Sequence, residues 1–578
     1  MDKLSDFADK IVDTDILIIG GEGAGGRAAI EAAKYNVKTT IVTKGIQGKC
    51  GATLTAGTDI DVDSKSIKEV LGMEGDVRDT KDLFAEDMLI EGGWANNQKI
   101  VEKHVEDAPI RIKELVDWGM ELWGPTLAPG HRYPRGVYSR GRYVVRVICE
   151  QIKKHADKIQ VIENTMVTDL LTHNGKVVGA TGVNIWTGEF CVFRAKAVII
   201  ATGGGQRIYP YTTAPEELTG DGHMMAYRAG AELEDMQYVQ FLTSTFRHPP
   251  TSTSSINPLL VTGIWLLNNR GERFMRTWDP ERMETATRDI VAVGIMNEIV
   301  EGRGWTSQHG DYVYASMKHL PDNMIEDYAL KMPRTKEFWD NMKKNAVPTF
   351  SASHFFCGGI KVNEDTETIL PGLYAAGECS AGDMGGNRLS GNAVTMIVVQ
   401  GAIAGKKAAE YALKAKEPEV DIKQVKELRD KVFQPLERKD GASAMKIKRR
   451  IQKMAWENIG VVRQGTWLEE ALKEIEEMKK ELPMICVRNK SRIFNKEWVD
   501  ALQAQNMLEL VEIIARSALM RTESRGVHFR KDYPNTDNNK WLKNIIAKQV
   551  NGKAQLRTEP TVITKWQPPK GCQPYPWR

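Results

Sequence analysis

One stretch near the N-terminus constrains the fold more than any other part of the chain. Residues Ile16–Ile19 are apolar and mostly β-branched, residues 20–26 are rich in glycine, and Arg27–Lys34 has a helical composition. A second strand is expected at Thr39–Thr43. This order is a βαβ unit of the length with which dinucleotide-binding domains begin. We therefore predict a parallel sheet with a dinucleotide site at the carboxyl ends of its strands.

The glycine cluster fits the G-x-G-x-x-G spacing in two registers. The strict spacing fits Gly21, Gly23 and Gly26. Counting from the end of the strand instead places Gly20, Glu22 and Gly25 at the three glycine positions. In either register, backbone N–H groups at the start of a helix can approach a pyrophosphate, whose charge the helix dipole favours. A plain tight turn is the alternative interpretation.

Two later stretches repeat the pattern of an apolar strand that ends in glycine, at residues 195–205 and 372–378. Because parallel sheets bind ligands at the carboxyl ends of their strands, these turns can converge on one cofactor with the first. After the second strand, the acidic residue of ordinary NAD sites is replaced by Thr43 and Lys44. This replacement argues against NAD.

The remaining chain divides by composition. The stretch from Met236 to Val347 looks irregular and contains several prolines, while residues 406–478 carry Lys, Glu and Ala at helical spacing. The proline-containing tail after Arg521 cannot form a long helix. We predict an α/β fold with a Rossmann-like dinucleotide-binding domain (1–235 and 348–410), an inserted capping domain (236–347), a C-terminal helical domain (411–520) and an extended arm (521–578).

Composition excludes several classes of protein. Lys and Arg number 79 against 76 Asp and Glu, a formal charge of +3, so no overall field attracts nucleic acid. No apolar run approaches the ~18 residues of a membrane span, so we expect no direct span. The N-terminal segment has acids where a secretory signal is basic. We expect a cytoplasmic protein.

The seven cysteines are scattered without the spacing of metal ligands. We therefore expect no metal site and no iron–sulfur cluster on this chain. A redox protein without a one-electron relay must send single electrons to a partner or use a soluble acceptor.

Several ordered motifs resemble those of one enzyme family. Residues 219–222 read T-G-D-G, residues 287–289 T-R-D, residues 353–360 S-H-F-F-C-G-G-I, residues 386–392 G-N-R-L-S-G-N, and residues 523–534 E-S-R-G-V-H-F-R-K-D-Y-P. The chain resembles the flavoprotein subunit of succinate dehydrogenase and fumarate reductase. That family also includes L-aspartate oxidase and, more distantly, adenylylsulfate reductase. The resemblance runs from about residue 13 to about residue 545.

The resemblance implies FAD, with the first glycine turn on the pyrophosphate and Glu378 on the ribityl or ribose side. The first domain is then an FAD-binding domain. Residues 390–393 would lie near the isoalloxazine, where the start of a helix stabilises negative charge on reduced flavin. The residues expected to bind FAD are Gly20, Gly23, Gly25, Thr43, Lys44, Gly51, Ala52, Thr53, Ala201, Thr202, Gly203, Asp221, Glu378, Arg388, Ser390, Asn392, Ala393 and Val394.

The mode of FAD attachment is expected to be non-covalent. Membrane-bound relatives carry a histidine after the second strand that bonds to FAD, whereas residues 48–53 here read G-K-C-G-A-T. Attachment through Cys50 is the alternative, and an isolated buried thiol is the interpretation that we favour.

Three residues are candidates for catalysis. The resemblance implies that Arg288 exchanges a proton with a dicarboxylate above the flavin, and that His354 and Arg388 clamp its carboxylate. A guanidinium fork with an imidazole suits planar, bidentate binding. The alternatives are a structural arginine paired with Asp289 and a histidine of the core.

Two departures from the family pattern weaken the substrate assignment. The family's Q-[FY]-H-P-T, whose histidine binds the second carboxylate, reads Q-F-L-T-S here, with Leu242 in place of the histidine. His248 is either its displaced equivalent or a loop histidine. The T-E-x-x-R-G stretch that carries a proton relay in fumarate reductases is missing from residues 261–271. Proton delivery must therefore differ.

The tail carries the cations Arg521, Arg525, His528 and Arg530 in the family's R-x-E-S-R-G-x-H-x-R pattern. A solvated basic face is one interpretation, and a structural role is the one that we favour.

The leading functional hypothesis is hydride transfer between flavin N5 and a carbon of a small anionic substrate, with succinate and fumarate as the leading pair. One alternative is sulfur chemistry like that of adenylylsulfate reductase. Another is a flavin electron-transfer subunit without its own substrate. The resemblance also implies an iron–sulfur partner subunit, through which the chain could lie peripherally at the inner face of a membrane.

Overall fold

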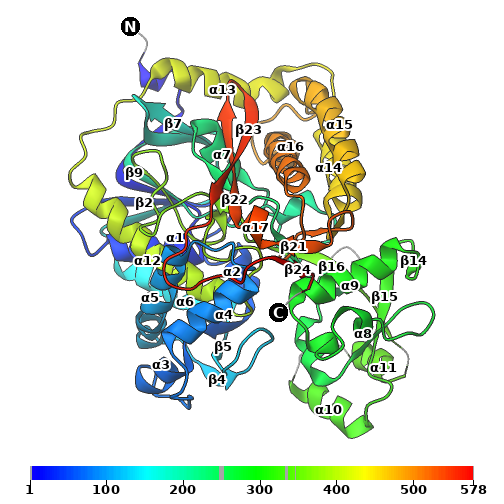
Figure 1. Ribbon diagram of the computed structural model, residues 1–578. Helices are drawn as coiled ribbons and strands as arrows, with labels where there is room; N and C mark the ends of the chain where they lie inside the picture. Colours follow the sequence, from blue (N-terminus) through cyan, green and yellow to red (C-terminus); the bar gives the residue numbers. More distant parts are fainter. Residues whose placement is uncertain (1–2, 247–252, 332–335, 345, 577–578) are drawn as a thin grey trace.

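A seven-stranded sheet organises the first part of the chain in this computed structural model, which describes residues 3–246, 253–331, 336–344 and 346–576 (Figure 1). The strand order is β6-β2-β1-β9-β8-β7, and β18 also pairs with β9. Pairing is parallel from β6 to β9 and at β18, and antiparallel at β8 and β7. The strands are β1 (Lys10–Ile19), β2 (Thr39–Val42), β6 (Ile159–Ile162), β7 (Thr165–His173), β8 (Lys176–Asn184), β9 (Phe190–Ile200) and β18 (Leu373–Ala375).

The prediction that three strand-and-glycine units share one sheet is confirmed. Ile19 at the end of β1 lies opposite Ile200 of β9, and Ile200 also lies opposite Ala375 of β18. The turns that follow these three strands therefore meet at one edge of the sheet. The α/β fold class is confirmed as well.

Two helices cross closely beside this edge because glycines remove the side chains between them. They are α1 (Gly23–Ala32) and α12 (Asn392–Ala412). A Cβ atom at Gly401 would lie 2.6 Å from the Ala24 carbonyl oxygen, and one at Gly405 would lie 2.2 Å from that of Ala28. Any larger residue would separate the two helices, so this contact fixes where α12 begins.

The stretch that looks irregular in sequence is regular in the structure. It contains most of a six-stranded sheet of order β12-β11-β16-β15-β13, with β14 paired to β15. Much of this stretch forms the lobe at the lower right of Figure 1. Its elements are β11 (Val239–Phe246), β12 (Thr253–Ser255), β13 (Trp265–Leu267), α8 (Met275–Trp278), α9 (Arg288–Val300), β14 (Trp305–Ser307), β15 (Gly310–Ser316), α10 (Asp322–Lys331), α11 (Lys336–Lys344) and β16 (Val347–Phe356).

A third sheet, of three strands, lies under the start of α12. Its order is β3-β5-β4, and all its pairs are antiparallel. The strands are β3 (Gly57–Asp61), β4 (Trp123–Thr126) and β5 (Gly136–Arg140). The helices around it are α2 (Ala52–Thr55), α3 (Ser64–Glu69), α4 (Lys81–Glu91), α5 (Gln98–Asp117) and α6 (Gly141–Lys154).

The C-terminal region is helical and then returns to the body of the molecule. Helices α14, α15 and α16 pack together, and α13 contacts α16. The tail forms a hairpin, β22–β23, which extends the short strands β10 and β17 into a four-stranded sheet. Its residues are thus more structured than an extended arm. The elements are α7 (Asp221–Ala229), β10 (Leu233–Glu234), β17 (Gly359–Ile360), α13 (Ile422–Glu437), α14 (Ala444–Ile459), α15 (Gly465–Glu481), α16 (Lys496–Met520), β22 (Lys543–Val550) and β23 (Lys553–Pro560). The exact domain boundaries stay a prediction.

The tail cations have a structural role, and the alternative of a solvated basic face is wrong. Glu523 accepts hydrogen bonds from Arg521 at 2.8 Å and from Arg525 at 2.7 and 2.9 Å, and all three side chains are almost fully buried. His528 Nδ1 lies 2.8 Å from Arg463, and Arg530 binds Asp532. The cations of this segment therefore hold the tail against the body.

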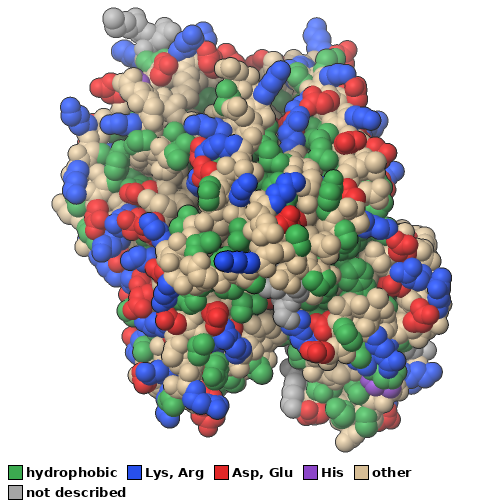
Figure 2. Space-filling view, in the orientation of Figure 1, with side chains coloured by type: hydrophobic (Ala, Val, Ile, Leu, Met, Phe, Trp, Pro, Cys, Tyr) green, Lys and Arg blue, Asp and Glu red, His purple; other side chains and the backbone are tan. Residues whose placement is uncertain are grey.

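The surface carries charges of both signs in close alternation, as Figure 2 shows for one face. This mixture agrees with the small formal charge. Among the described residues, no helix has the length and apolar character needed to cross a bilayer.

Loss of Glu523 should destabilise the fold strongly. Glu523→Gln leaves the buried Arg525 without its counter-charge and Arg521 with only Asp235, at 3.3 Å. Breaking a buried pair in this way costs about 3–5 kcal/mol. We expect a clear fall in the thermal unfolding midpoint. Glu417→Gln is the matched control, because it removes an ion pair with Lys196 in which the glutamate side chain is 86% exposed. Equal unfolding midpoints for the two variants would contradict the structural role.

Candidate active site

A cavity opens at the shared edge of β1, β2 and β9, with a volume of about 920 Å³ including its open mouth. Its walls come from segments far apart in the sequence. The expected FAD-binding residues that line it are Gly20, Gly23, Thr43, Lys44, Gly51, Ala52, Thr53, Ala201, Thr202, Gly203, Asp221 and Glu378.

The structure distinguishes the two glycine registers. Gly20 ends β1 with φ of +98°, a conformation that favours glycine. A Cβ atom at Gly25 would lie 1.8 Å from the Gly20 carbonyl oxygen, so Gly25 allows helix α1 to pack on the strand end. Gly25 thus lies behind the cavity wall. The tight turn and the close packing of helix on strand are the roles of the first and third glycines of the motif. Gly20 and Gly25 therefore take these positions, and Glu22 takes the position of the second glycine.

Glu22 is an unusual group to find in a phosphate-binding turn. Its Oε1 accepts a hydrogen bond from the Gly48 backbone N–H at 2.9 Å, and within the described chain its Oε2 has no hydrogen-bond partner. Burial raises the pKa of Glu22 to about 6. The residue therefore changes charge near neutral pH, beside the place where the motif binds a pyrophosphate.

Cys50 lies next to Glu22, with its Sγ atom 3.5 Å from Glu22 Oε1. Burial raises the pKa of Cys50 to about 12, and the Glu22 carboxylate adds to that effect. The thiol is therefore neutral, and a neutral thiol is a poor nucleophile. Covalent attachment of flavin through Cys50 is disfavoured on this ground.

Lys44 and Asp221 close another part of the wall. Lys44 Nζ donates to Asp221 Oδ2 at 2.7 Å and to Thr219 at 3.1 Å. Asp221 also accepts from Asn506 of α16 at 2.7 Å. This contact links the cavity wall to the C-terminal helices. The sequence pattern did not predict such a link.

Glu378 lies where the cavity meets the capping sheet. Its Oε1 accepts from the Phe356 backbone N–H at 3.0 Å and from the Gln206 amide. Burial raises the pKa of Glu378 to about 7. Nearby, the buried hydroxyl of Thr202 has no partner within the described residues. A glycine cradle with unpartnered buried polar groups fits a dinucleotide such as FAD.

Residues Ser390 to Val394 form the start of α12. Gly391 precedes the helix with φ of +92°, and the side chain of Asn392 is fully buried. Neither amide atom of Asn392 has a hydrogen-bond partner in the part of the chain that the structure describes. Ala393 is half-buried and Val394 is buried.

Arg288 is the first residue of α9, and its guanidinium group reaches the start of α12. Its Nη2 donates to Ser390 Oγ at 3.0 Å, and its Nη1 lies 3.5 Å from Gln240 Oε1. Asp289 instead accepts from the Thr287 hydroxyl at 2.7 Å. The side chain of Arg288 is therefore directed into the site.

His354 and Arg388 lie close enough to Arg288 for its charge to act on both. His354 Nδ1 lies 2.8 Å from the Thr213 hydroxyl, and Arg388 stacks on Phe355 with its guanidinium carbon 4.8 Å from the ring centre. Burial holds the pKa of His354 well below its usual range, and the charges of Arg388 and Arg288 lower it further. Burial also lowers the pKa of Arg388 to about 9, assisted by Arg288. The structure brings the three predicted catalytic residues together.

Gln240 and Asn387 connect Arg288 with Arg388. The sequence pattern did not predict a role for either residue. The Gln240 amide donates to Asn387 Oδ1 at 2.6 Å and to the Arg388 carbonyl at 2.9 Å. Its oxygen faces Arg288. Gln240 was visible in the Q-F-L-T-S stretch, but only the pairing of β11 with β16 gives it this position.

The two departures from the family pattern have a clear local structure. Leu242 is buried in β11 opposite Ala352, and His248 lies outside the described residues. In place of the missing relay, a 3₁₀ helix (Asn257–Thr262) leads into β13.

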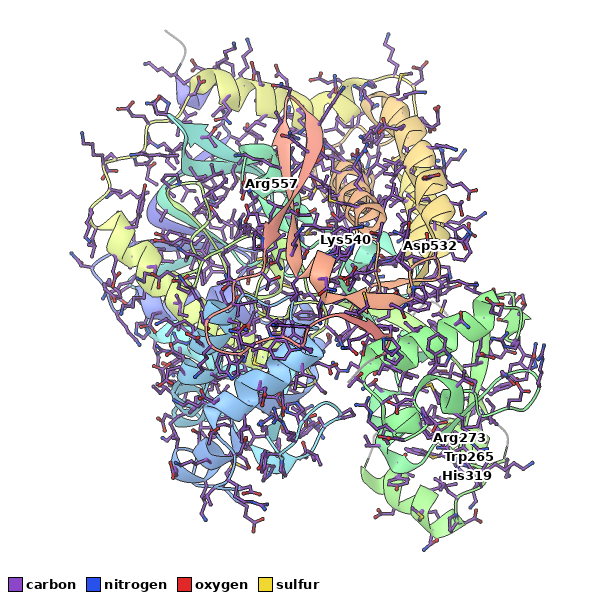
Figure 3. The ribbon with its side chains drawn as sticks, viewed as in Figure 1. Trp265, Arg273, His319, Asp532, Lys540 and Arg557 are labelled. Atoms are coloured by element: carbon purple, nitrogen blue, oxygen red, sulfur yellow. The ribbon has the colours of Figure 1, made fainter. Side chains whose placement is uncertain are left out.

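The half-buried aromatic residue of β13 stacks with an exposed histidine of the capping lobe. Trp265 and His319 stack with ring centres 3.8 Å apart, and Arg273 lies over Trp265 (Figure 3). Arg273 is also paired with Glu284. This segment therefore supplies aromatic and ion-pair contacts at the place where the family pattern has its T-E-x-x-R-G stretch.

Comparison with known proteins identifies the family. A family model described as an FAD binding domain matches residues 15–394, and one described as the C-terminal part of the fumarate reductase flavoprotein matches residues 448–573. A subunit of the CoM/CoB fumarate reductase of Methanothermobacter marburgensis is 34% identical over 552 residues, 93% of this chain and 97% of that protein. The chain belongs to the fumarate reductase and succinate dehydrogenase flavoprotein family.

Further relatives agree with this assignment. The fumarate reductase flavoprotein subunit of Mycobacterium tuberculosis is 30% identical, over 96% of this chain and 98% of that protein. A mutant of E. coli quinol fumarate reductase has a TM-score of 0.87 at 25% identity, over 97% of this chain and 99% of the other. Adenylylsulfate reductase of Archaeoglobus fulgidus shares the fold, with a TM-score of 0.77 at 18% identity and coverage of 98% and 99%. The protein is an FAD-dependent oxidoreductase.

Glu22 should make FAD binding depend on pH. As pH rises through about 6, the Glu22 carboxylate becomes charged and repels the pyrophosphate, so FAD affinity should fall. Glu22→Gln should bind FAD more tightly at pH 8 and remove most of this dependence. Fluorescence titration of the apoprotein with FAD measures it.

Glu163→Gln is the matched control for this measurement. Glu163 accepts from the Gln47 backbone N–H at 3.0 Å and does not line the cavity. A Glu22→Gln protein with the pH dependence of the wild type would show that Glu22 stays neutral or lies away from the phosphates.

Proposed function

We propose that this flavoprotein transfers a hydride between FAD and an anionic carboxylate substrate, with fumarate and succinate as the leading pair. One observation carries the proposal. Arg388 is buried, Arg288 and a neutral His354 lie half-buried beside it, and the guanidinium Nε atoms of both arginines have no partner within the described residues. A small carboxylate would supply the missing negative charge and acceptors.

Electrostatics supports an anionic ligand. Burial and the charge of Arg288 lower the pKa of Arg388 to about 9, so the two cations destabilise each other. A bound carboxylate reverses this effect, since an opposite charge nearby favours the charged form. The pocket is thus built to gain free energy when an anion enters.

The proposed roles follow from the positions of the groups. Arg388, held by Gln240 through its backbone and stacked on Phe355, offers a fixed fork to one carboxylate. His354 offers a single N–H while its other nitrogen faces Thr213. Arg288 polarises the substrate and exchanges a proton with its carbon.

FAD supplies the hydride chemistry when it is bound. We propose that Gly20, Gly23 and the start of α1 hold its pyrophosphate, because helix N-termini favour phosphate. The remaining cavity residues named above, with Ser390 to Val394, would hold its other parts. The start of α12 would stabilise negative charge on the reduced ring.

The family position of the second carboxylate ligand holds an apolar residue in this chain. Leu242 stands at the family position of the second histidine, is buried and cannot donate a hydrogen bond. This observation favours a substrate with a single strongly bound carboxylate as the second candidate.

We also propose an iron–sulfur partner subunit. The two reductase relatives are named as subunits. The cysteines of the described chain are scattered and free, and no group of three or more His, Cys, Asp or Glu there could hold a metal ion, so a partner would have to carry the cluster that divides electron pairs. Through such a partner the protein could lie peripherally at a membrane.

A direct test follows the redox state of the bound flavin by its absorbance. Holoenzyme reduced with dye should be re-oxidised by fumarate, and Arg288→Gln should slow this step by roughly 10²–10⁴-fold while FAD stays bound. Arg276→Gln, an exposed arginine of α8, is the matched control. Wild-type protein that responds to no C4 dicarboxylate would exclude the leading pair.

A further inference from the structure

The end of β2 lacks a group that dinucleotide sites use there. In dinucleotide-binding folds, an acidic side chain after the second strand accepts a hydrogen bond from a ribose hydroxyl of the cofactor. Here β2 ends at Val42, and Thr43, Lys44 and Gly45 follow it along the cavity wall. None of these three residues is an acid. An acceptor for a ribose at this place must therefore come from another segment of the chain.

Lys44 does not take over this role. A lysine has three N–H donors and no acceptor. Its Nζ donates to Asp221 Oδ2 at 2.7 Å, to Thr219 Oγ1 at 3.1 Å and to the Glu217 carbonyl oxygen at 3.2 Å. All three donors are thus used within the protein. The third of these contacts holds the backbone of Glu217 beside the end of β2.

The Glu217 side chain brings a carboxylate to this place. Glu217 lines the cavity, and its Oε2 atom is buried without a hydrogen-bond partner among the described residues. A Cβ atom at Gly45 would lie 3.9 Å from Glu217 Oε1, so the carboxylate lies directly beside the chain that follows β2. The last torsion of a glutamate is broad, so either oxygen can turn toward the cavity. A buried acceptor without a partner is costly, and a ligand that carries hydroxyl groups would remove this cost.

The turn that carries Glu217 is fixed by Arg207. The Arg207 backbone N–H donates to the Leu218 carbonyl oxygen, and its Nε donates to the Pro215 carbonyl oxygen, each at 3.1 Å. Its Nη2 also pairs with Glu216 at 2.8 Å, and the side chain of Glu216 is 76% exposed. The two neighbouring acids therefore have different surroundings. Glu216 faces solvent, whereas Glu217 lines the cofactor cavity.

Glu217 shares the cavity with a second acid, Glu22. Burial is the main cause of the raised pKa of Glu22, and the charge of Glu217 adds to it. Two acids in the cavity of an anionic cofactor are unfavourable unless each is compensated. Glu22 is compensated when it takes up a proton, since its pKa is about 6. A hydrogen-bond donor on the ligand would compensate Glu217.

We propose that Glu217 accepts hydrogen bonds from the 2′- and 3′-hydroxyl groups of the adenosine ribose of FAD, and so replaces the acid that is missing after β2. A carboxylate offers two acceptor oxygens and no donor, which matches a pair of hydroxyl groups. The inference goes beyond the proposed function, because it concerns the end of the cofactor that takes no part in hydride transfer. It depends on FAD binding alone.

Loss of the Glu217 carboxylate tests this proposal through the binding of FAD to the apoprotein. Glu217→Ala removes hydrogen bonds to a charged acceptor, so FAD affinity should fall by roughly 10–100-fold. A carboxylate that only repels the pyrophosphate gives the opposite result, because its loss would tighten binding. Fluorescence titration separates these outcomes by their sign. Tighter or unchanged binding of FAD by Glu217→Ala overturns the proposal.

Glu216→Ala is the matched control, because it removes the neighbouring acid and its ion pair with Arg207 at the surface. FAD affinity should stay at the wild-type value. The unfolding midpoints of both apoproteins should stay close to that of the wild type, since an exposed pair contributes little and Glu217 Oε2 has no partner to lose. If Glu217→Ala lowers the midpoint, Glu217→Gln serves in its place. It keeps the shape and one acceptor oxygen, and should weaken FAD binding by a smaller factor.

A cofactor analogue places the contact on the ribose. In the wild type, FAD made with 2′-deoxyadenosine should bind roughly 10-fold or more weakly than FAD. In Glu217→Ala the two cofactors should bind equally, because the acceptor of the hydroxyl group is gone. A wild type that binds both cofactors equally contradicts the proposal, as does a preference for FAD that Glu217→Ala retains in full. These measurements use no substrate, so a failure of the proposed function leaves them unchanged.

Discussion

Desolvation of positive charge is the constraint on which the rest of this site depends. A buried guanidinium group lies beside a half-buried one and a half-buried imidazole; both arginine charges lower the pKa of His354, and Arg288 lowers that of Arg388. Such an arrangement persists only if rigid neighbours hold it. The Gln240 amide, the Phe355 ring and the first turns of α9 and α12 provide that support. A carboxylate bound there, as proposed, would relieve this repulsion between the cations.

The glycines determine how closely the supporting elements approach. Those of α12 let it lie directly on α1, so the start of α12 has one possible position above the sheet edge. Gly391 leaves the space that Asp61 occupies. Main-chain packing thus sets the distances between groups whose chemistry depends on a few tenths of an ångström. The positions of the site residues are well defined because the backbone segments that carry them pack in direct contact.

The sequence predicted those parts of the structure that depend on local constraint. A strand that ends in glycine and leads into a helix has few alternatives, and the first such unit lies where it was expected. The family motifs also indicated Arg288, His354 and Arg388. Glu217 could not be found in this way, because only the contact of its backbone with Lys44 brings it to the end of β2, and an isolated acid in sequence has no signature. The regularity of the capping lobe was missed because its prolines lie between short strands.

The β22–β23 hairpin has a consequence for how the protein is made. It extends a sheet that begins with β10, so residues near position 234 receive their last partner only when residues near 545 leave the ribosome. Asp235 in addition accepts from Asn544 and from the backbone N–H of Ile545. The four-stranded sheet is therefore completed only when the last part of the chain has been made, whereas the seven-stranded sheet takes no strand from the tail.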